Sequence, residues 1–297
     1  MYSKDQTRVL QQASTDLLKK AGKISVADID RLREVLRFHE YRYYILNDPL
    51  LADVEYDQLF KRLQQLETDD PSLLTPDSPT QRVARGLTRE FPTVQHLVPM
   101  LSLDNSYNAD DLMDFDRKAR ELTGLAEIEY CVEPKFDGGS ISLIYENDLL
   151  QRGATRGDGV EGDEVTANVK QIRSIPLSAK FSAYGIQQVE IRGEVLINKD
   201  NFRQYNEKLM EEGLPPLANP RNAAAGTLRI KDPAEAGKRN LEAFVYHISY
   251  YAMQKGKPVP AELKTHSGSL GLLWELGFRS PEKEKRISNS TDMYFIN

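Results

Sequence analysis

Lys135 stands among charged and small residues whose types and spacing could support nucleophilic chemistry. Glu133 and Asp137 lie two positions to either side of it, within residues 133–138. In an extended backbone, residues two apart lie on the same face. Pro134 cannot donate a hydrogen bond to a sheet, so it favours a sheet edge or the end of a strand. A lysine amine in such a place could attack phosphorus once it has lost its proton.

The charges around this lysine do not all favour that chemistry. Carboxylates oppose deprotonation of an amine, so nearby cations such as arginines or Mg²⁺ would be needed to favour it. Gly138 and Gly139 would let the chain turn closely past a bound group. A surface salt-bridge cluster explains residues 133–138 equally well, because short motifs often match by chance.

The elements that would position this motif fall into two parts, and the first has the periodicity of helices. Residues 1–24 are polar and predicted to be helical, and Ser25 begins a typical helix start. Apolar residues then recur at helical spacing from Ile29 toward Tyr44 and again after Asp53. A proline-rich linker follows. We therefore expect residues 1–88 to form a small helical domain.

Residues 89–297 have a different pattern, in which strands predominate. Alternating or β-prone stretches lie at residues 128–132, 140–145, 149–155, 189–195 and 241–251. Asn147-Asp148 predicts a hairpin turn between two of them. Helices are predicted at residues 110–122, 199–212 and 267–276. The sequence thus predicts an α+β fold, with a mixed, mainly antiparallel sheet in the second domain.

The composition is that of an acidic, soluble protein. Of 297 residues, 40% are hydrophobic and 28% are charged. Without an apolar run of about 20 residues or a signal-peptide core, we expect a cytoplasmic monomer with no membrane partner. The single cysteine, Cys131, excludes an internal disulfide and a multi-cysteine zinc site, and we predict no metal ligands here. A net charge of −6 predicts weak DNA affinity for this part alone.

Several further motifs resemble those of the bacterial NAD-dependent DNA ligases. Lys-x-Asp-Gly at Lys135 is the nucleophile signature of covalent nucleotidyltransferases, and the similarity extends from about residue 28 to residue 280. The other matching motifs lie at residues 39–44, 53–57, 99–105, 154–159, 162–169, 192–195 and 219–229. ATP-dependent ligases and capping enzymes lack both the helical domain and the last of these blocks.

The resemblance implies a nucleotidyltransferase domain of the covalent ligase type and a three-step reaction. Lys135 takes AMP from NAD and releases nicotinamide mononucleotide, with Mg²⁺ or Mn²⁺ as the metal. AMP then passes to the 5′-phosphate of a nick in duplex DNA, and the 3′-hydroxyl seals the nick during replication and repair. Each step displaces a group at phosphorus, so in-line positioning and charge stabilisation should supply the catalysis.

The helical domain of such ligases holds the nicotinamide mononucleotide half of NAD. The matching positions here are Tyr43, Tyr44, Asp53, Tyr56 and Asp57. Aromatic rings can face the cationic nicotinamide. Structural roles compete with this one: Asp53 is also placed as a helix N-cap, Tyr56 falls on the core stripe, and Tyr44 stands where several relatives have His.

The second domain would hold the adenylyl half. The resemblance implies that Ser102 and Leu103 contact adenosine, Glu133 contacts adenine, Arg156 contacts ribose or phosphate, Glu194 contacts ribose, and Tyr246 stacks on adenine. Glu194 could instead be a solvated strand residue, and Tyr246 a half-buried strand tyrosine.

Three more residues match positions near the reacting phosphate. Arg221 and Arg229 would face phosphate or the DNA end, although surface arginines are common. Asp137 would position Lys135 or orient metal-bound water.

Relatives of this type continue into parts that these 297 residues do not contain. The resemblance implies two further lysines that contact the adenylyl phosphate, then OB-fold, zinc-finger, helix-hairpin-helix and BRCT parts. We therefore expect zinc and nicked DNA to be bound through the longer protein. This piece should bind NAD, adenylylate itself slowly and fail to join nicks. Two alternatives stay open: an ATP-using RNA ligase or capping enzyme, and a nucleotide-binding fragment without turnover.

Overall fold

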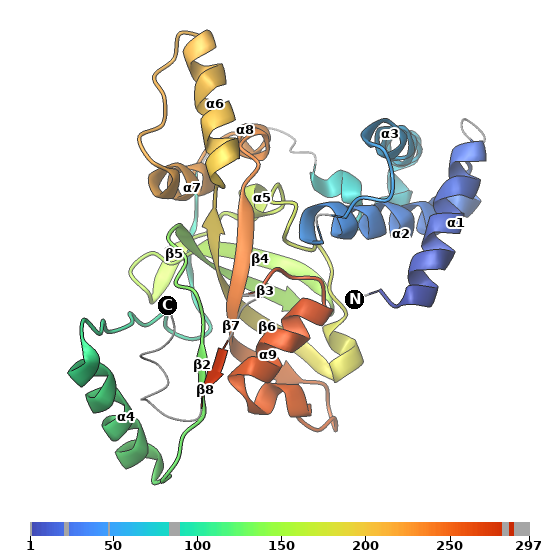
Figure 1. Ribbon diagram of the computed structural model, residues 1–297. Helices are drawn as coiled ribbons and strands as arrows, with labels where there is room; N and C mark the ends of the chain where they lie inside the picture. Colours follow the sequence, from blue (N-terminus) through green and yellow to red (C-terminus); the bar gives the residue numbers. More distant parts are fainter. Residues whose placement is uncertain (1, 21–23, 47, 83–89, 281–284, 288–297) are drawn as a thin grey trace.

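The helical periodicity of the first part of the sequence gives three packed helices. The computed structural model describes residues 2–20, 24–46, 48–82, 90–280 and 285–287. Helices α1 (Lys4–Lys20), α2 (Ile29–Glu40) and α3 (Asp53–Asp69) pack together on one side of the molecule (Figure 1). Their apolar stripes meet in one buried cluster, which includes Leu10, Ala13, Leu17, Leu32, Val35, Leu36, Phe38, Leu59 and Leu63. Because α1 supplies part of this core, it is an integral helix of the unit.

Short turns precede and follow α2, and the second of them carries two of the predicted ligand-binding residues. A short 3₁₀ turn (Val26–Asp28) precedes α2, and the backbone N–H of Ser25 donates to Asp28 Oδ2 at 3.1 Å, as the predicted helix start requires. At its other end, α2 continues into a π-helical turn, Tyr41–Ile45, a feature that often occurs at functional sites. This turn carries Tyr43 and Tyr44.

The prediction that Asp53 caps helix α3 is wrong. Ala52 occupies the N-cap position, and its backbone N–H donates to Glu55 Oε2 at 3.0 Å. Asp53 is the first helical residue, and its side chain is exposed. The carboxylate of Asp53 is therefore not used to hold the helix end.

A four-stranded antiparallel sheet forms the centre of the second part. Its order is β4-β3-β6-β7, with β3 (Gly139–Glu146), β4 (Leu149–Thr155), β6 (Ile186–Leu196) and β7 (Glu242–Met253). Asn147 and Asp148 join β3 to β4 with φ values of 50° and 68°, as a two-residue hairpin turn requires. The structure confirms the predicted α+β fold, and each predicted strand and helix of this part is present.

The remaining elements surround this sheet (Figure 1). Two small antiparallel pairs join β1 (Thr93–Gln95) to β5 (Glu161–Asp163) and β2 (Tyr130–Val132) to β8 (Lys285–Ile287). The helices are α4 (Ala109–Thr123), α5 (Thr166–Val169), α6 (Lys199–Glu211), α7 (Pro220–Leu228), α8 (Pro233–Lys238) and α9 (His266–Glu275). Short 3₁₀ turns lie at Pro71–Leu73, Pro79–Arg82, Phe181–Tyr184 and Ala261–Lys264. Each helix of the described ranges is too short or too polar to cross a membrane.

Sequence periodicity missed three short helices, α5, α7 and α8. Two of them have clear start signals: Asn219 before Pro220, and Asp232 before Pro233. Asn219 Oδ1 accepts the backbone N–H of Asn222 at 2.8 Å. These helices span nine and six residues, too few for a helical period to be recognised.

One buried arginine fastens the helical unit to the sheet unit. Arg82, whose side chain is 3% exposed, donates to the carbonyl oxygens of Lys170, Ile172 and Ile175 at 3.0, 3.2 and 2.8 Å. Glu40, at the end of α2, pairs with Arg173 from the same segment at 2.9 Å. The junction between the two units is therefore strongly polar.

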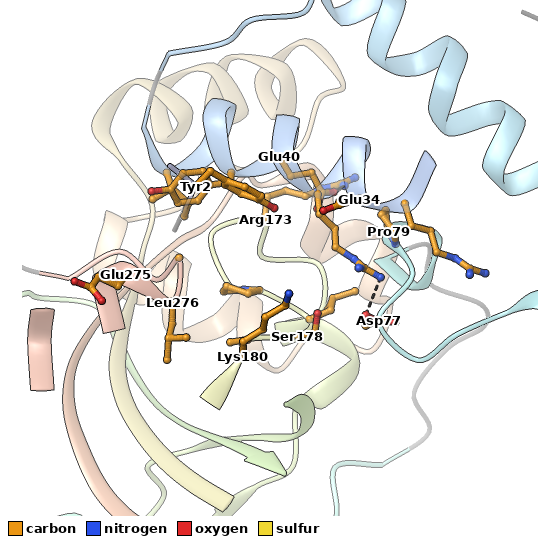
Figure 2. Close-up of a pocket in the computed structure, with 18 of the residues that line it drawn as sticks. Tyr2, Glu34, Glu40, Asp77, Pro79, Arg173, Ser178, Lys180, Glu275 and Leu276 are labelled. Carbon is orange, nitrogen blue, oxygen red and sulfur yellow. Dashed lines mark hydrogen bonds and ion pairs between the residues drawn. The ribbon is translucent and has the colours of Figure 1, made fainter. Parts of the chain in front are cut away.

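A cavity of about 630 Å³ lies at this junction (Figure 2). Its walls come from α2, from residues 173–184 and from the end of α9. Charged side chains of both signs line it, and on the side of the helical unit Arg37 pairs with Asp77 at 2.7 Å. Because the cavity separates two covalently linked units, it marks the surface along which they adjoin.

We expect Arg82→Met to lower the free energy of unfolding by about 2–4 kcal/mol, because buried carbonyl groups would lose their donor. Urea denaturation would measure the change. Arg8→Met, which alters an exposed arginine on α1, is the matched control and should have little effect. Equal stabilities of the two variants would contradict this account of the junction.

Candidate active site

Lys135 lies in the connection between β2 and β3, in a loop that is fixed at both ends. Its side chain is exposed. Next to it, Phe136 stacks on Phe244 of β7, with ring centroids 4.5 Å apart. After it, the backbone N–H of Gly138 donates to Glu194 Oε1 at 3.1 Å. The neighbours of Lys135 thus hold the loop to the sheet, while its amine stays accessible.

Gly138 is required by the close passage of this loop over β6. A Cβ atom at this position would lie 2.1 Å from the carbonyl oxygen of Val195. The close neighbour of this glycine is the backbone of the sheet, and a close turn past a bound group stays a prediction.

Glu194 of β6 is the carboxylate that holds this loop. It is 8% exposed, and besides Gly138 it accepts the Ser140 hydroxyl at 2.8 Å. Burial raises the pKa of Glu194, and the charges of Lys135 and Arg221 oppose that rise. The alternative that Glu194 is a solvated strand residue is wrong.

Helix α7 carries one arginine at each end. Arg221, in its first turn, pairs with Asp137 at 3.2 Å, and Arg229, just after its end, pairs with Asp163 of β5 at 2.8 Å. Both side chains are mostly exposed, at 64% and 63%. Small residues of α7 pack on the sheet opposite Gly139, so the helix can approach closely. Helix α7 thus places one cation, Arg221, in contact with the lysine motif.

A glycine turn after β4 places Arg156 beside Ser102. The backbone N–H of Met100 donates to the Gly159 carbonyl at 2.7 Å, where Gly159 has a φ of 96°. Arg156 Nη2 then donates to Ser102 Oγ at 2.7 Å. The two motifs that carry these residues are 54 positions apart in sequence, and the structure brings them together as expected. Leu103, next to them, is 77% exposed.

Glu190 is a site-forming residue that the sequence reading did not single out. It is fully buried on β6 and accepts the hydroxyls of Ser142 and Ser249 at 2.7 and 2.9 Å. It also accepts the backbone N–H groups of Leu97 and Val98, both at 3.3 Å. Glu190 therefore fixes the segment that leads to Ser102. The alternation of the strand could have predicted this role, because residues 190, 192 and 194 share one face of it.

Tyr246 occupies an irregular position in β7. Arg192 pairs with His247 and Gly193 with Val245, so Tyr246 is the extra residue of a β-bulge. Its side chain is half-buried, as the structural alternative expected. Burial and then the charge of Glu194 raise the pKa of the Tyr246 phenol.

Glu133 lies apart from the partners of Asp137. It is in hydrogen-bond contact with His266 Nε2, at the start of α9, and the Cys131 thiol donates to it at 3.8 Å. Asp137 contacts α7 instead. Residues 133–137 belong to no strand, and Glu133 and Asp137 contact different partners.

The candidate residues of the helical unit form a second group. Tyr56 donates to Glu40 at 3.2 Å, and burial raises the pKa values of Tyr56 and Tyr44. Asp53 and Asp57 are exposed on the first turns of α3. Tyr56 therefore has a structural hydrogen bond, and it faces a charged partner as well as the core.

Tyr43 and Tyr44 line a cavity of about 610 Å³ that α6 and α8 complete from the opposite side. Their rings lie 4.8 Å apart. Lys135, in contrast, adjoins β6 and α7. The structure therefore assembles two candidate half-sites, one in each unit, that face different neighbours.

Comparisons with known proteins match both parts of the chain. The family model of the NAD-dependent DNA ligase adenylation domain matches residues 88–295, and that of the DNA ligase-like, N-terminal NAD⁺-binding domain matches residues 24–84. A DNA ligase of Sulfurihydrogenibium azorense is 56% identical over 98% of this chain and 42% of its own length. Those of Aquifex aeolicus and Thermotoga maritima are 50% and 48% identical, over 98% and 88% of this chain.

The chain spans only part of these relatives. It covers 42%, 41% and 36% of the three ligases.

Gly138→Ala should lower the free energy of unfolding by about 1–3 kcal/mol, because the loop must move away from β6. The matched control is Gly226→Ala. Gly226 lies in α7 with open space around its would-be Cβ, so this change should stabilise by up to about 1 kcal/mol. Thermal or urea unfolding would measure both, and a neutral Gly138→Ala would contradict the tight passage described here.

Glu194 should also make stability depend on pH. Its pKa is higher in the folded chain than in the unfolded chain, so the ionised carboxylate costs stability. That cost is absent below the unfolded pKa and complete above the folded one. Relative to Glu194→Gln, the natural chain should lose stability as pH rises from the ordinary carboxyl pKa of about 4.3 through the raised pKa of the folded chain. The matched control is Glu129→Gln, which changes an exposed carboxylate; its stability difference from the natural chain should not follow this pattern. If the stability difference between the natural chain and Glu194→Gln were the same at every pH, the raised pKa of Glu194 would be refuted.

Proposed function

The chain belongs to the NAD-dependent DNA ligase family, and we propose that its role is to form the lysine–AMP intermediate of that reaction on Lys135. The observation that supports this most directly is the assembly around Glu194. One buried carboxylate holds the loop of an exposed lysine, and the cation Arg221 pairs with Asp137 of the same loop. A surface salt-bridge cluster would not require a buried anchor of this kind.

In the proposed step, Lys135 Nζ attacks the adenylyl phosphorus of NAD after losing a proton to solvent. A phosphorus–nitrogen bond forms, the pyrophosphate phosphorus–oxygen bond breaks, and nicotinamide mononucleotide leaves. Arg221 would stabilise the charge that develops on the phosphate oxygens. A bound Mg²⁺ would share that charge, and Asp137, exposed beside Lys135, could hold one of its water ligands.

The residues around this loop would orient the adenylyl half. Arg156 offers a planar set of donors suited to ribose or phosphate oxygens, and Ser102 already positions it. Glu194 would accept a ribose hydroxyl. Tyr246, re-aimed by the bulge, would stack on adenine, with Glu133 accepting from the adenine amine. Leu103 would cover the base with its exposed side chain.

The helical unit would hold the nicotinamide mononucleotide half. Tyr56 and the one-turn-apart pair Asp53 and Asp57 share a face of α3, and Tyr43 and Tyr44 lie on the π-helical turn. The aromatic rings would face the cationic nicotinamide and the carboxylates its ribose. Because the two half-sites face different neighbours here, we propose that the helical unit reorients to bring both halves of one NAD together.

Nick sealing in replication and repair is proposed for the complete ligase. Transfer of AMP to a 5′-phosphate and attack by the 3′-hydroxyl require that the enzyme bind duplex DNA. These 297 residues carry a net charge of −6, so we propose that the rest of the complete ligase contributes most of the DNA binding. Arg221 and Arg229 would contact only the reacting end. A cytoplasmic, monomeric protein stays a prediction.

Intact mass spectrometry after incubation with NAD and Mg²⁺ tests the proposal. We expect one AMP adduct on the natural chain and on Lys255→Ala, which removes an exposed lysine beyond β7. Lys135→Ala should carry none. An adduct formed from ATP and not from NAD would favour the RNA ligase or capping alternative. A chain that binds NAD without any adduct would be a nucleotide-binding fragment.

A further inference from the structure

Three side chains that can ligate a metal meet next to the proposed adenine site. Cys131 lies in β2, Glu133 follows it, and His266 begins α9. The Sγ, carboxylate and imidazole donor atoms all lie within 4.8 Å of one another. The thiol of Cys131 is 3.8 Å from Glu133 Oε1, and the Glu133 carboxylate contacts His266 Nε2. One thiol, one carboxylate and one imidazole thus point to a common place.

The chemical types of these donors suit one class of cation. Zn²⁺ binds thiolate sulfur at about 2.3 Å and imidazole nitrogen or carboxylate oxygen at about 2.0–2.2 Å. In a tetrahedron, such donors are roughly 3–4 Å from one another, and the 3.8 Å between Cys131 and Glu133 falls in that range. A cation would replace the hydrogen-bond contact between Glu133 and His266. Thiolate and imidazole together select zinc-like ions over Mg²⁺.

The protein holds these ligands on fixed elements. Thr265 caps α9, its Oγ1 accepting the Gly268 N–H at 3.1 Å, and the helix packs on the core through buried leucines. His247 of β7 is a neighbour from a third element, with its ring centroid 6.0 Å from that of His266. It could complete the coordination after a change of rotamer, and otherwise a water molecule would do so.

We propose that Cys131, Glu133 and His266 bind a zinc-like divalent cation, and that the bound cation withdraws Glu133 from adenine. The second half of this proposal rests on the proposed function, in which Glu133 contacts the base of NAD. The site is then an inhibitory one: the cation and NAD compete for the same carboxylate. Adenylylation of Lys135 would slow in zinc without any change in Lys135 itself.

The cation site can be tested by optical spectroscopy without any activity measurement. Cys131 is the single cysteine of the 297 residues, so thiolate-to-Co²⁺ charge-transfer absorption reports on this site alone. Titrating the metal-free chain with Co²⁺ should produce that band with one-to-one saturation, and Zn²⁺ should abolish it. Cys131→Ser should remove the band, and His266→Gln should weaken Co²⁺ binding at least about tenfold.

The matched control is Glu129→Gln, which removes an exposed carboxylate two positions before Cys131 and should leave Co²⁺ affinity unchanged. Absence of the band in the natural chain would overturn the site. The site would also be overturned if His266→Gln bound Co²⁺ with the same affinity as the natural chain, because the thiol alone would then account for binding.

Competition with NAD is tested separately, through the AMP adduct. Zn²⁺ should raise the NAD concentration needed for adenylylation of the natural chain. Cys131→Ser should adenylylate normally without zinc and resist this inhibition. Equal inhibition of both chains would overturn the regulatory half. If the metal-free chain forms no adduct at all, the proposed function fails, while the Co²⁺ titration still decides the cation site.

Discussion

A carboxylate buried beneath the lysine loop is the constraint on which the rest of the site depends. A buried carboxylate such as Glu194 needs hydrogen-bond donors, and it accepts hydrogen bonds from the Gly138 backbone N–H and the Ser140 hydroxyl. Satisfying Glu194 therefore fixes the loop that precedes β3. One strand position farther along the same face, Arg192 donates to the Val98 carbonyl at 2.6 Å, and Glu190 holds the neighbouring N–H groups. A single face of β6 thus sets both walls of the site.

Much of the fold could be predicted from local patterns. The Asn147-Asp148 turn, the alternation along β6 and the apolar stripes of α2 and α3 are each determined by residues close in sequence. The short helix α7 was missed because its period is too brief, although Asn219-Pro220 signals its start. Asp53 was misassigned as a cap because the adjacent Ala52 takes that place, with Glu55 serving its backbone N–H. Local chemistry offers more than one solution at such helix ends.

The candidate site was predictable as a set of residues and much less as a geometry. Motif resemblance selected Lys135, Glu194 and Arg156, but it could not show that Glu194 is buried. The contact between Glu133 and His266 joins residues 133 positions apart, and only the packing of α9 against the sheet creates it. For the same reason, the three-ligand cluster is invisible to any reading of spacing. The individual ligand roles in both half-sites stay predictions.

The irregular pairing of β7 adds two side chains to the strand without shifting the rest of it. Tyr246 and Ser249 are extra residues relative to β6, and each resets the alternation of the side chains that follow. Losing either residue would restore a regular ladder locally, and the residues that follow would keep their partners on β6. The loss would instead remove one side chain: Ser249, which binds the buried Glu190, or Tyr246, whose phenol senses the charge of Glu194. The two bulges are therefore positions at which the length of β7 can change while the register of the sheet is kept.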